Sequence, residues 1–268
     1  MMPTLLSYYS EDTGAGSPLL LLHGFTGSSD NWAELTPRLS HRFRVIRVDL
    51  PGHGRTAAPA DHARGTVPAV AADLATLLAE RNATPAHILG YSMGARLALG
   101  IALGHPHVVR SLILESGSPG LATAAERAAR RTADEALAER IERNGIVAFV
   151  DEWERLPLWE SQRNLPEATR RRLRERRLRC DPAGLAASLR QMGTGAQPSF
   201  WDDLGRLQAP TLLITGALDA RFCAIAAAMR AQNPALQNQV VAGAGHAPHL
   251  EQPAAWLELV ERWLKVES

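Results

Sequence analysis

The sequence has only two cysteines, Cys180 and Cys223, which are far apart and form no Cys-x-x-Cys pair. This scarcity argues against a disulfide framework and a thiolate metal site, so we expect two free thiols. Long apolar runs are also missing, and residues 1–10 lack the basic and apolar regions of a secretory signal. We therefore expect a cytoplasmic protein with no membrane partner.

An excess of charge of either sign is absent too, because 29 basic and 28 acidic side chains leave a formal net charge of +1. That balance gives no reason to expect a nucleic acid as partner. Lysine is nearly missing: Lys265 is the only one, so the other basic side chains are arginines. The hydrophobic content of 46% is typical of a globular protein with a large core. The sequence carries no signal for an oligomeric state.

Short apolar runs alternate with segments of helical periodicity over most of the chain. Residues 19–22 are four leucines followed by His-Gly, which is typical of a buried parallel strand. Similar runs lie at 43–48, 87–89, 111–116, 210–216 and 239–241, and a weaker alternation at 5–9 predicts an edge strand. Helical spacing of apolar residues is found at 67–81 and 254–265, and a shorter helix is expected from Asp30 or Asn31 to Leu39. This order predicts an α/β fold, a mostly parallel sheet flanked by helices.

The alternation stops between residues 121 and 200, which are helical in character and carry fifteen of the arginines. We interpret this segment as a helical cap inserted over the sheet. Residues 1–120 and 201–268 then form the core, and the whole chain is one domain.

The segment 90–94 reads Gly-Tyr-Ser-Met-Gly and lies between the apolar run 87–89 and a helix-compatible run, 95–103. A Gly-x-Ser-x-Gly motif between a strand and a helix is typical of a nucleophile elbow, in which glycines relieve crowding around a strained turn. The motif is common by chance, and an ordinary glycine-flanked turn is the alternative. The helix that follows would place its positive dipole end near Ser92.

A serine hydroxyl becomes reactive when a histidine takes its proton and a carboxylate orients that histidine. In an elbow fold these partners follow the serine in the order acid, then histidine, at later strand ends. Asp219 follows the run ending at Gly216, and His246 follows the run ending near Val241. We therefore predict Ser92, Asp219 and His246 as a catalytic triad.

Other histidines fit the base less well. His23 and His53 lie in strand-end loops but precede Ser92, so we expect them to pack loops, and His249 is expected to be a neighbour of the base. An oxyanion or enolate also needs two amide donors aimed at one point. We predict the backbone NH groups of Met93 and Phe25 for this role, and we expect no metal and no organic cofactor.

Four segments together resemble the α/β-hydrolase superfamily nearly end to end: 23–27, 49–54, 90–94 and 244–246. Within it, three segments resemble MenH, the family of 2-succinyl-6-hydroxy-2,4-cyclohexadiene-1-carboxylate synthases of menaquinone biosynthesis. They are Gly-Tyr-Ser-Met-Gly-Ala-Arg at 90–96, Glu-Ser-Gly-Ser-Pro-Gly-Leu at 115–121 with Glu-Arg-Ala-Ala-Arg at 126–130, and Met-Gly-Thr-Gly-Ala-Gln-Pro at 192–198.

The resemblance implies a lyase that eliminates pyruvate from 2-succinyl-5-enolpyruvyl-6-hydroxy-3-cyclohexene-1-carboxylate. In this family the serine, activated by histidine and aspartate, abstracts a proton and forms no acyl-enzyme. The implied partner is a small molecule with three carboxylates. Arginines suit it, because a guanidinium binds a carboxylate through two charge-assisted hydrogen bonds.

Arg96 lies one helical turn past Ser92, where a charge is costly unless it meets an internal acid or opens onto the pocket. We favour the pocket. The resemblance adds Arg130 and Arg177 as ligands of substrate carboxylates, and Tyr91, Trp153 and Phe222 as pocket walls. Two of these have an ordinary alternative: Arg177 belongs to an arginine-rich run that is typical of a solvated helix face, and Trp153 could simply fill the core.

Two other functions remain open. A true hydrolase, acting on an ester or a carbon–carbon bond of a small carboxylated substrate, would use the same triad. A noncatalytic ligand receptor on this fold is the third possibility, and the intact Ser92, Asp219 and His246 argue against it.

Overall fold

The computed structural model describes residues 6–267, and its centre is a seven-stranded sheet with the order β1-β3-β2-β4-β5-β6-β7. Every neighbouring pair is parallel except β1 and β3, which run antiparallel. The strands are β1 (Ser10–Thr13), β2 (Ser17–Leu22), β3 (Phe43–Val48), β4 (Ala86–Tyr91), β5 (Val109–Glu115), β6 (Thr211–Gly216) and β7 (Gln237–Val241). This arrangement confirms the predicted α/β fold.

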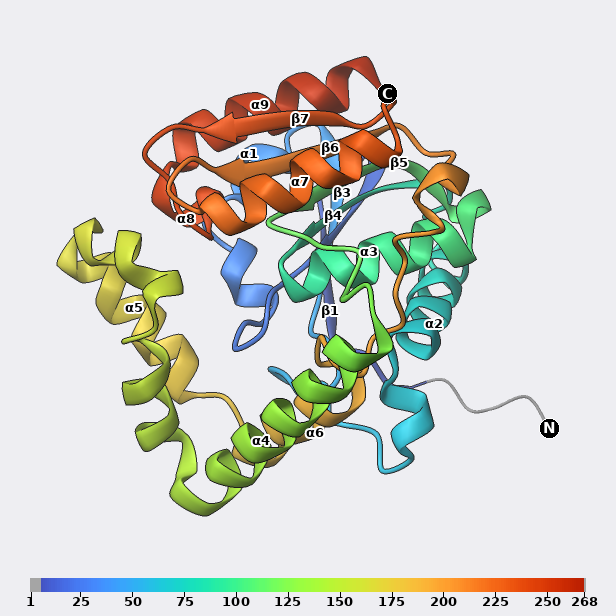
Figure 1. Cartoon of the computed structure of the whole chain (residues 1–268). Helices are drawn as coiled ribbons and strands as arrows, with labels where there is room; N and C mark the ends of the chain where they lie inside the picture. Colours follow the sequence, from blue (N-terminus) through green and yellow to red (C-terminus); the bar gives the residue numbers. More distant parts are fainter. Residues whose placement is uncertain (1–5, 268) are drawn as a thin grey trace.

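Helices cover both faces of the sheet (Figure 1). The α-helices are α1 (Thr36–Leu39), α2 (Val67–Glu80), α3 (Met93–Gly104), α4 (Ala124–Trp153), α5 (Glu167–Leu178), α6 (Pro182–Met192), α7 (Ala220–Gln232), α8 (Pro248–Glu251) and α9 (Pro253–Val266). Short 3-10 turns are η1 (Ser29–Trp32), η2 (His62–Gly65), η3 (Pro106–Val108), η4 (Pro157–Asn164) and η5 (Leu204–Arg206).

Alternate side chains of each strand enter two separate cores, as the two-residue period of a strand requires. On β2, Leu20 and Leu22 belong to the core that includes residues of α2, α3 and α7, whereas Leu19 and Leu21 belong to the core that includes residues of η1, α1 and α9. All four leucines are fully buried. A strand buried on both faces has no polar side, which is why the sequence shows continuous apolar runs here.

Two expectations for the N-terminal region were wrong. The edge strand is Ser10–Thr13 and not residues 5–9, of which Leu5 lies outside the described residues. The helix expected from Asp30 or Asn31 to Leu39 is two short pieces, η1 and α1, with Pro37 in the first turn of the second. Proline cannot continue a preceding helix, because its ring clashes with the earlier turn.

Residues 121–200 form α4, η4, α5 and α6 and contain no strand, and they project to one side of the sheet (Figure 1). Helix α4 bends at Gly145, whose φ is 76°. Its two halves pack against α6 through a small apolar core that includes Ile141, Phe149 and Leu185, and Phe25 of the loop after β2 joins it. Among residues 6–267, no helix is long and apolar enough to cross a membrane.

Candidate active site

Ser92 lies in the turn between β4 and α3 with φ 51° and ψ −106°, a backbone conformation that L-residues rarely adopt. The flanking glycines make this turn possible. A Cβ on Gly90 would lie 2.3 Å from the carbonyl oxygen of Gly94, and a Cβ on Gly94 would lie 2.2 Å from that of Leu22. The segment 90–94 therefore has the backbone of a nucleophile elbow.

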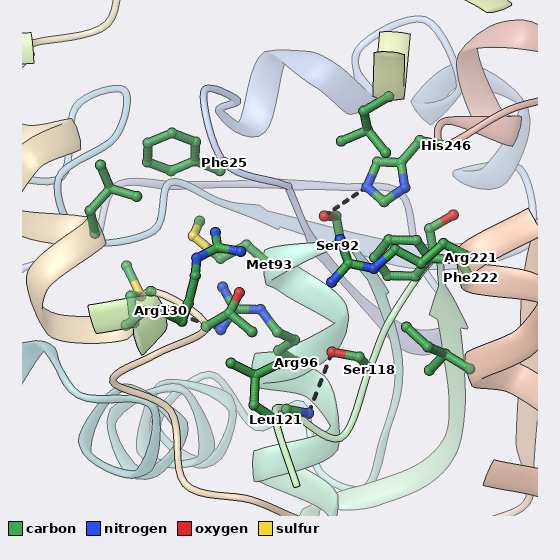
Figure 2. A pocket seen from close by; sticks show the side chains of 18 of the residues that line it. Phe25, Ser92, Met93, Arg96, Ser118, Leu121, Arg130, Arg221, Phe222 and His246 are labelled. Atoms are coloured by element: carbon green, nitrogen blue, oxygen red, sulfur yellow. Dashed lines mark hydrogen bonds between the residues drawn. The ribbon is translucent and has the colours of Figure 1, made fainter. Parts of the chain in front are cut away.

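The three predicted triad residues meet at the carboxyl edge of the sheet. The Oγ of Ser92 is 3.0 Å from Nε2 of His246 (Figure 2). Nδ1 of His246 is 2.8 Å from Oδ2 of Asp219. The second carboxylate oxygen of Asp219 accepts a hydrogen bond from the backbone NH of Phe222 at the start of α7. This geometry allows His246 to take the serine proton while Asp219 orients the ring.

The loop that carries His246 is held by a second carboxylate, Glu251 of α8. Its Oε2 accepts from the NH of Gly245 at 2.6 Å, and its Oε1 accepts from the NH of Ala247 at 3.1 Å. The backbone NH groups of the residues before and after His246 thus bind one side chain, Glu251, which sequence reasoning did not find.

The remaining histidines of the strand-end loops do not touch Ser92. The Nε2 of His23 accepts from the NH of Leu50, and burial lowers the pKa of His23 below its usual value. Burial, with the neighbouring His23, lowers the pKa of His53 to about 3. His249 is buried against Glu115, with Nδ1 2.7 Å from its Oε1.

A cavity of about 570 Å³ opens beside Ser92 and His246 (Figure 2). Most residues predicted for the site line it: Phe25, Tyr91, Met93, Arg96, Arg130, Trp153 and Phe222. The backbone amides of Phe25 and Met93 donate no hydrogen bond to any described residue, so they are available to bind an oxygen.

Arg96 is 9% exposed and has no carboxylate partner within residues 6–267. Its Nη1 donates to the carbonyl oxygen of Met192 at 2.9 Å and to Oε1 of Gln197 at 2.7 Å, both neutral acceptors. Burial, with the nearby charge of Arg130, lowers the pKa of the Arg96 guanidinium to about 10, so it is still charged at neutral pH. A buried cation without an anion is costly, and an anionic ligand in the cavity would offset that cost.

Arg130 reaches the same cavity from α4, where its Nε donates to the buried Asp134 at 2.7 Å. Trp153, at the end of α4, packs edge-to-face on Phe25 with ring centroids 5.5 Å apart. The helical segment therefore contacts the loop that carries one of the predicted oxyanion donors.

Arg177 is not among the residues that line this cavity. Its guanidinium donates to Glu154 at 2.9 Å and to Gln162 at 3.0 Å, and it lies over the ring of Trp159, 5.3 Å from the ring centroid. The structure thus places Arg177 in an ion pair, and its contact with substrate stays a prediction.

Sequence reasoning did not assign every residue that lines the cavity, and Trp159 and Arg221 are two of those it missed. Trp159 of η4 packs edge-to-face on His246 with centroids 5.5 Å apart, and Arg221 follows two positions after Asp219. Proximity to the triad acid is the one signal that could have found Arg221. Three residues that line the cavity each carry a buried polar atom with no hydrogen-bond partner in the described part of the chain: Ser116 Oγ, Trp153 Nε1 and Trp159 Nε1.

Groups of three or more histidine, cysteine or carboxylate side chains that could hold a metal do not occur within residues 6–267. Cys180 and Cys223 are free, as expected.

The strand order, the elbow serine and the acid and histidine from later strand ends define a protein of the α/β-hydrolase fold. The model of the family described as alpha/beta hydrolase fold matches residues 17–253. A Bacillus subtilis (strain 168) protein, provisionally named a 2-succinyl-6-hydroxy-2,4-cyclohexadiene-1-carboxylate synthase, is 41% identical over 95% of this chain and 92% of its own. The Klebsiella pneumoniae (strain 342) enzyme of that name is 34% identical over 93% of this chain and 95% of its own.

The structure of MenH from S. aureus superposes with a TM-score of 0.92 at 32% identity, covering 97% of this chain and 98% of that one. The chain belongs to the MenH family of 2-succinyl-6-hydroxy-2,4-cyclohexadiene-1-carboxylate synthases.

Proposed function

We propose that this protein is a lyase of menaquinone biosynthesis, which eliminates pyruvate from 2-succinyl-5-enolpyruvyl-6-hydroxy-3-cyclohexene-1-carboxylate to give 2-succinyl-6-hydroxy-2,4-cyclohexadiene-1-carboxylate. Its family membership supports this assignment. The observation that carries it is the buried guanidinium of Arg96, which faces the cavity beside Ser92 with no carboxylate partner. A substrate with three carboxylates supplies the missing charge.

In the proposed reaction His246 takes the proton of Ser92 as the serine oxygen removes a proton from the ring carbon that bears the succinyl group. The electron pair moves into the ring, the ring double bond shifts, and the bond between the ring and the enolpyruvyl oxygen breaks. The leaving group departs as the enolate of pyruvate and takes the proton held by His246 to become pyruvate, so the histidine is neutral again and Ser92 keeps the proton from the ring. Ser92 thus acts as a general base, and no bond forms between serine and substrate.

The negative charge that develops during this step falls on the ketone oxygen of the succinyl group. The free amides of Phe25 and Met93 line the cavity and are proposed to bind that oxygen. Met93 is the first residue of α3, so the positive end of the helix dipole adds to the stabilisation.

We further propose that residues 121–200 act as a cap on the catalytic core. Arg130, Trp153 and Trp159 enter the cavity from this segment, where they would bind a carboxylate and keep water from the reacting carbon. A cytoplasmic location stays a prediction from the sequence.

The assay mixes purified protein with the enzymatically generated substrate and follows pyruvate through a coupled dehydrogenase. Wild type is expected to release pyruvate, and Ser92→Ala to slow release by roughly 10²- to 10⁴-fold, as is typical of losing a positioned general base. Ser40→Ala, outside the cavity, is the matched control.

A parallel assay of 4-nitrophenyl acetate hydrolysis separates the lyase from a hydrolase. Ester hydrolysis without pyruvate release by wild type would contradict the lyase assignment. Unchanged pyruvate release by Ser92→Ala would contradict the role of the serine as base.

A further inference from the structure

Arg221 lies at the start of α7, two positions after the acid of the triad. Asp219 caps this helix by accepting the NH of Phe222, so the position of Arg221 is set by the residue that orients His246. Figure 2 shows its side chain entering the cavity from the side of Phe222 and His246, whereas Arg96 and Arg130 lie on the other side.

The guanidinium of Arg221 makes no hydrogen bond and no ion pair within residues 6–267, and its one ring contact is with its neighbour Phe222 at 5.9 Å. The other two cavity arginines have polar partners, since Arg96 donates to Gln197 and Arg130 donates to Asp134. Among the three cavity arginines, Arg221 is therefore the one whose guanidinium has no polar partner within residues 6–267.

The charges that line the cavity are unequal. Three guanidinium groups face a single carboxylate, Glu126, and that carboxylate is held in the capping box of Thr123 at the start of α4. A proposed substrate with three carboxylates matches three cationic groups. Arg177 lies outside this cavity and pairs with Glu154.

We propose that Arg221 binds the substrate carboxylate that lies farthest from Arg96 and Arg130, and so fixes the substrate across Ser92. This inference rests on the proposed function for the identity of the ligand. The carboxylate belongs to either the enolpyruvyl group or the succinyl chain, and both present the same group to a guanidinium.

The first test compares Arg221→Ala, Arg221→Lys and wild type in the pyruvate-release assay. Arg221→Ala is expected to lower kcat/KM about tenfold or more, as for one lost charged hydrogen bond, mostly through KM. Arg221→Lys should recover part of the loss because it restores the charge. Arg230→Ala, at the far end of the same helix and outside the cavity, should stay within about twofold of wild type.

The second test measures binding without turnover, through the fluorescence of the tryptophans that line the cavity. Succinate and pyruvate are titrated separately into wild type and Arg221→Ala. Weaker binding of one anion by about fivefold or more identifies the carboxylate that Arg221 holds.

Equal binding of both anions by wild type and Arg221→Ala would overturn the proposal, even if kcat/KM fell. So would an Arg221→Ala enzyme with wild-type kcat/KM while wild type itself releases pyruvate. If wild type releases no pyruvate, the proposed function fails, and the titrations still decide whether Arg221 binds a carboxylate.

Discussion

Replacing Gln197 by Glu places a carboxylate beside the buried guanidinium of Arg96 without changing the size of the side chain. The Oε1 of Gln197 already accepts a hydrogen bond from Arg96 at 2.7 Å, and its Nε2 has no partner in the described chain. Gln197→Glu therefore loses no hydrogen bond and adds the counter-charge that the cavity lacks. We expect the variant to be more stable and less active than wild type.

The magnitudes follow from the burial of Arg96. Lowering its pKa from 12.5 to about 10 corresponds to a penalty on the charged form of about 3 kcal/mol, present at every pH below that value. A new carboxylate relieves part of this penalty, but its own desolvation offsets much of the gain. A net stabilisation of about 1 kcal/mol is expected, which raises Tm by about 2–4 °C in a chain of this size.

Activity should change in the opposite direction, because the substrate carboxylate must compete with an internal one. Losing one charged hydrogen bond costs about 1.5–3 kcal/mol, so kcat/KM for pyruvate release should fall roughly 10- to 100-fold. Gln197→Met, which removes the acceptor but adds no charge, is the matched control and should keep more activity than Gln197→Glu.

The measurements are thermal melting and pyruvate release on the same preparations. A Gln197→Glu enzyme with wild-type kcat/KM would refute the reasoning that Arg96 binds a substrate carboxylate. A lower Tm together with lost activity would show that the substitution damages the fold, and Arg96→Met would then be needed to lower kcat/KM at a near-wild-type Tm.

Three further predictions concern the scaffold. Gly94→Ala should lower the free energy of unfolding in urea by about 2 kcal/mol or more, because its Cβ would overlap a carbonyl group of β2. Gly104→Ala on the same helix is the control: its Cβ would meet no heavy atom within 4 Å, so it should lower that free energy by less than about 1 kcal/mol. Glu251→Ala should lower kcat about tenfold by releasing the loop of His246, and a change confined to KM would contradict this positioning role. His53 has a folded pKa of about 3 against 6.5 in the unfolded chain, so the free energy of unfolding should fall by about 1.4 kcal/mol per pH unit as the pH drops below about 6.5. The urea midpoints of wild type at about pH 7.5 and pH 5.5 should therefore differ, and those of His53→Phe should differ less.

The sheet could be predicted from the sequence where strands are buried on both faces, because such strands are apolar throughout. The run 19–22 is one example, and the structure places it inside β2. Strand β1 could not be found in this way. Its residues, Ser-Glu-Asp-Thr, have an exposed or half-buried pattern, and the strand is defined by backbone hydrogen bonds to β3 alone. A strand that is held by backbone pairing alone and buries neither face has no alternation of apolar and polar residues, so the sequence does not reveal it.

The triad geometry followed from chain order, because each member lies just after a strand and all parallel strands end at one edge of the sheet. Chain order could not predict which arginines line the cavity. Of the fifteen arginines in residues 121–200, Arg130 alone lines the cavity, while Arg174 and Arg190 are bonded to carboxylates of α4. Which face of α4 meets the cavity depends on the bend at Gly145, and the periodicity of one helix does not predict such a bend.

The two arginines that flank the serine from the core differ in how the sequence could reveal them. Arg96 is four positions after Ser92, on a helix whose other faces are apolar, so the cost of burying its charge points to a ligand. Arg221 lies on an exposed helix start, where an arginine is free to extend into water. Because Asp219 caps α7, the start of this helix and Arg221 with it lie beside the cavity. The apolar residues around Arg96 in the sequence indicate that its charge is buried, whereas the one sequence signal for Arg221 is its position two residues after the triad acid.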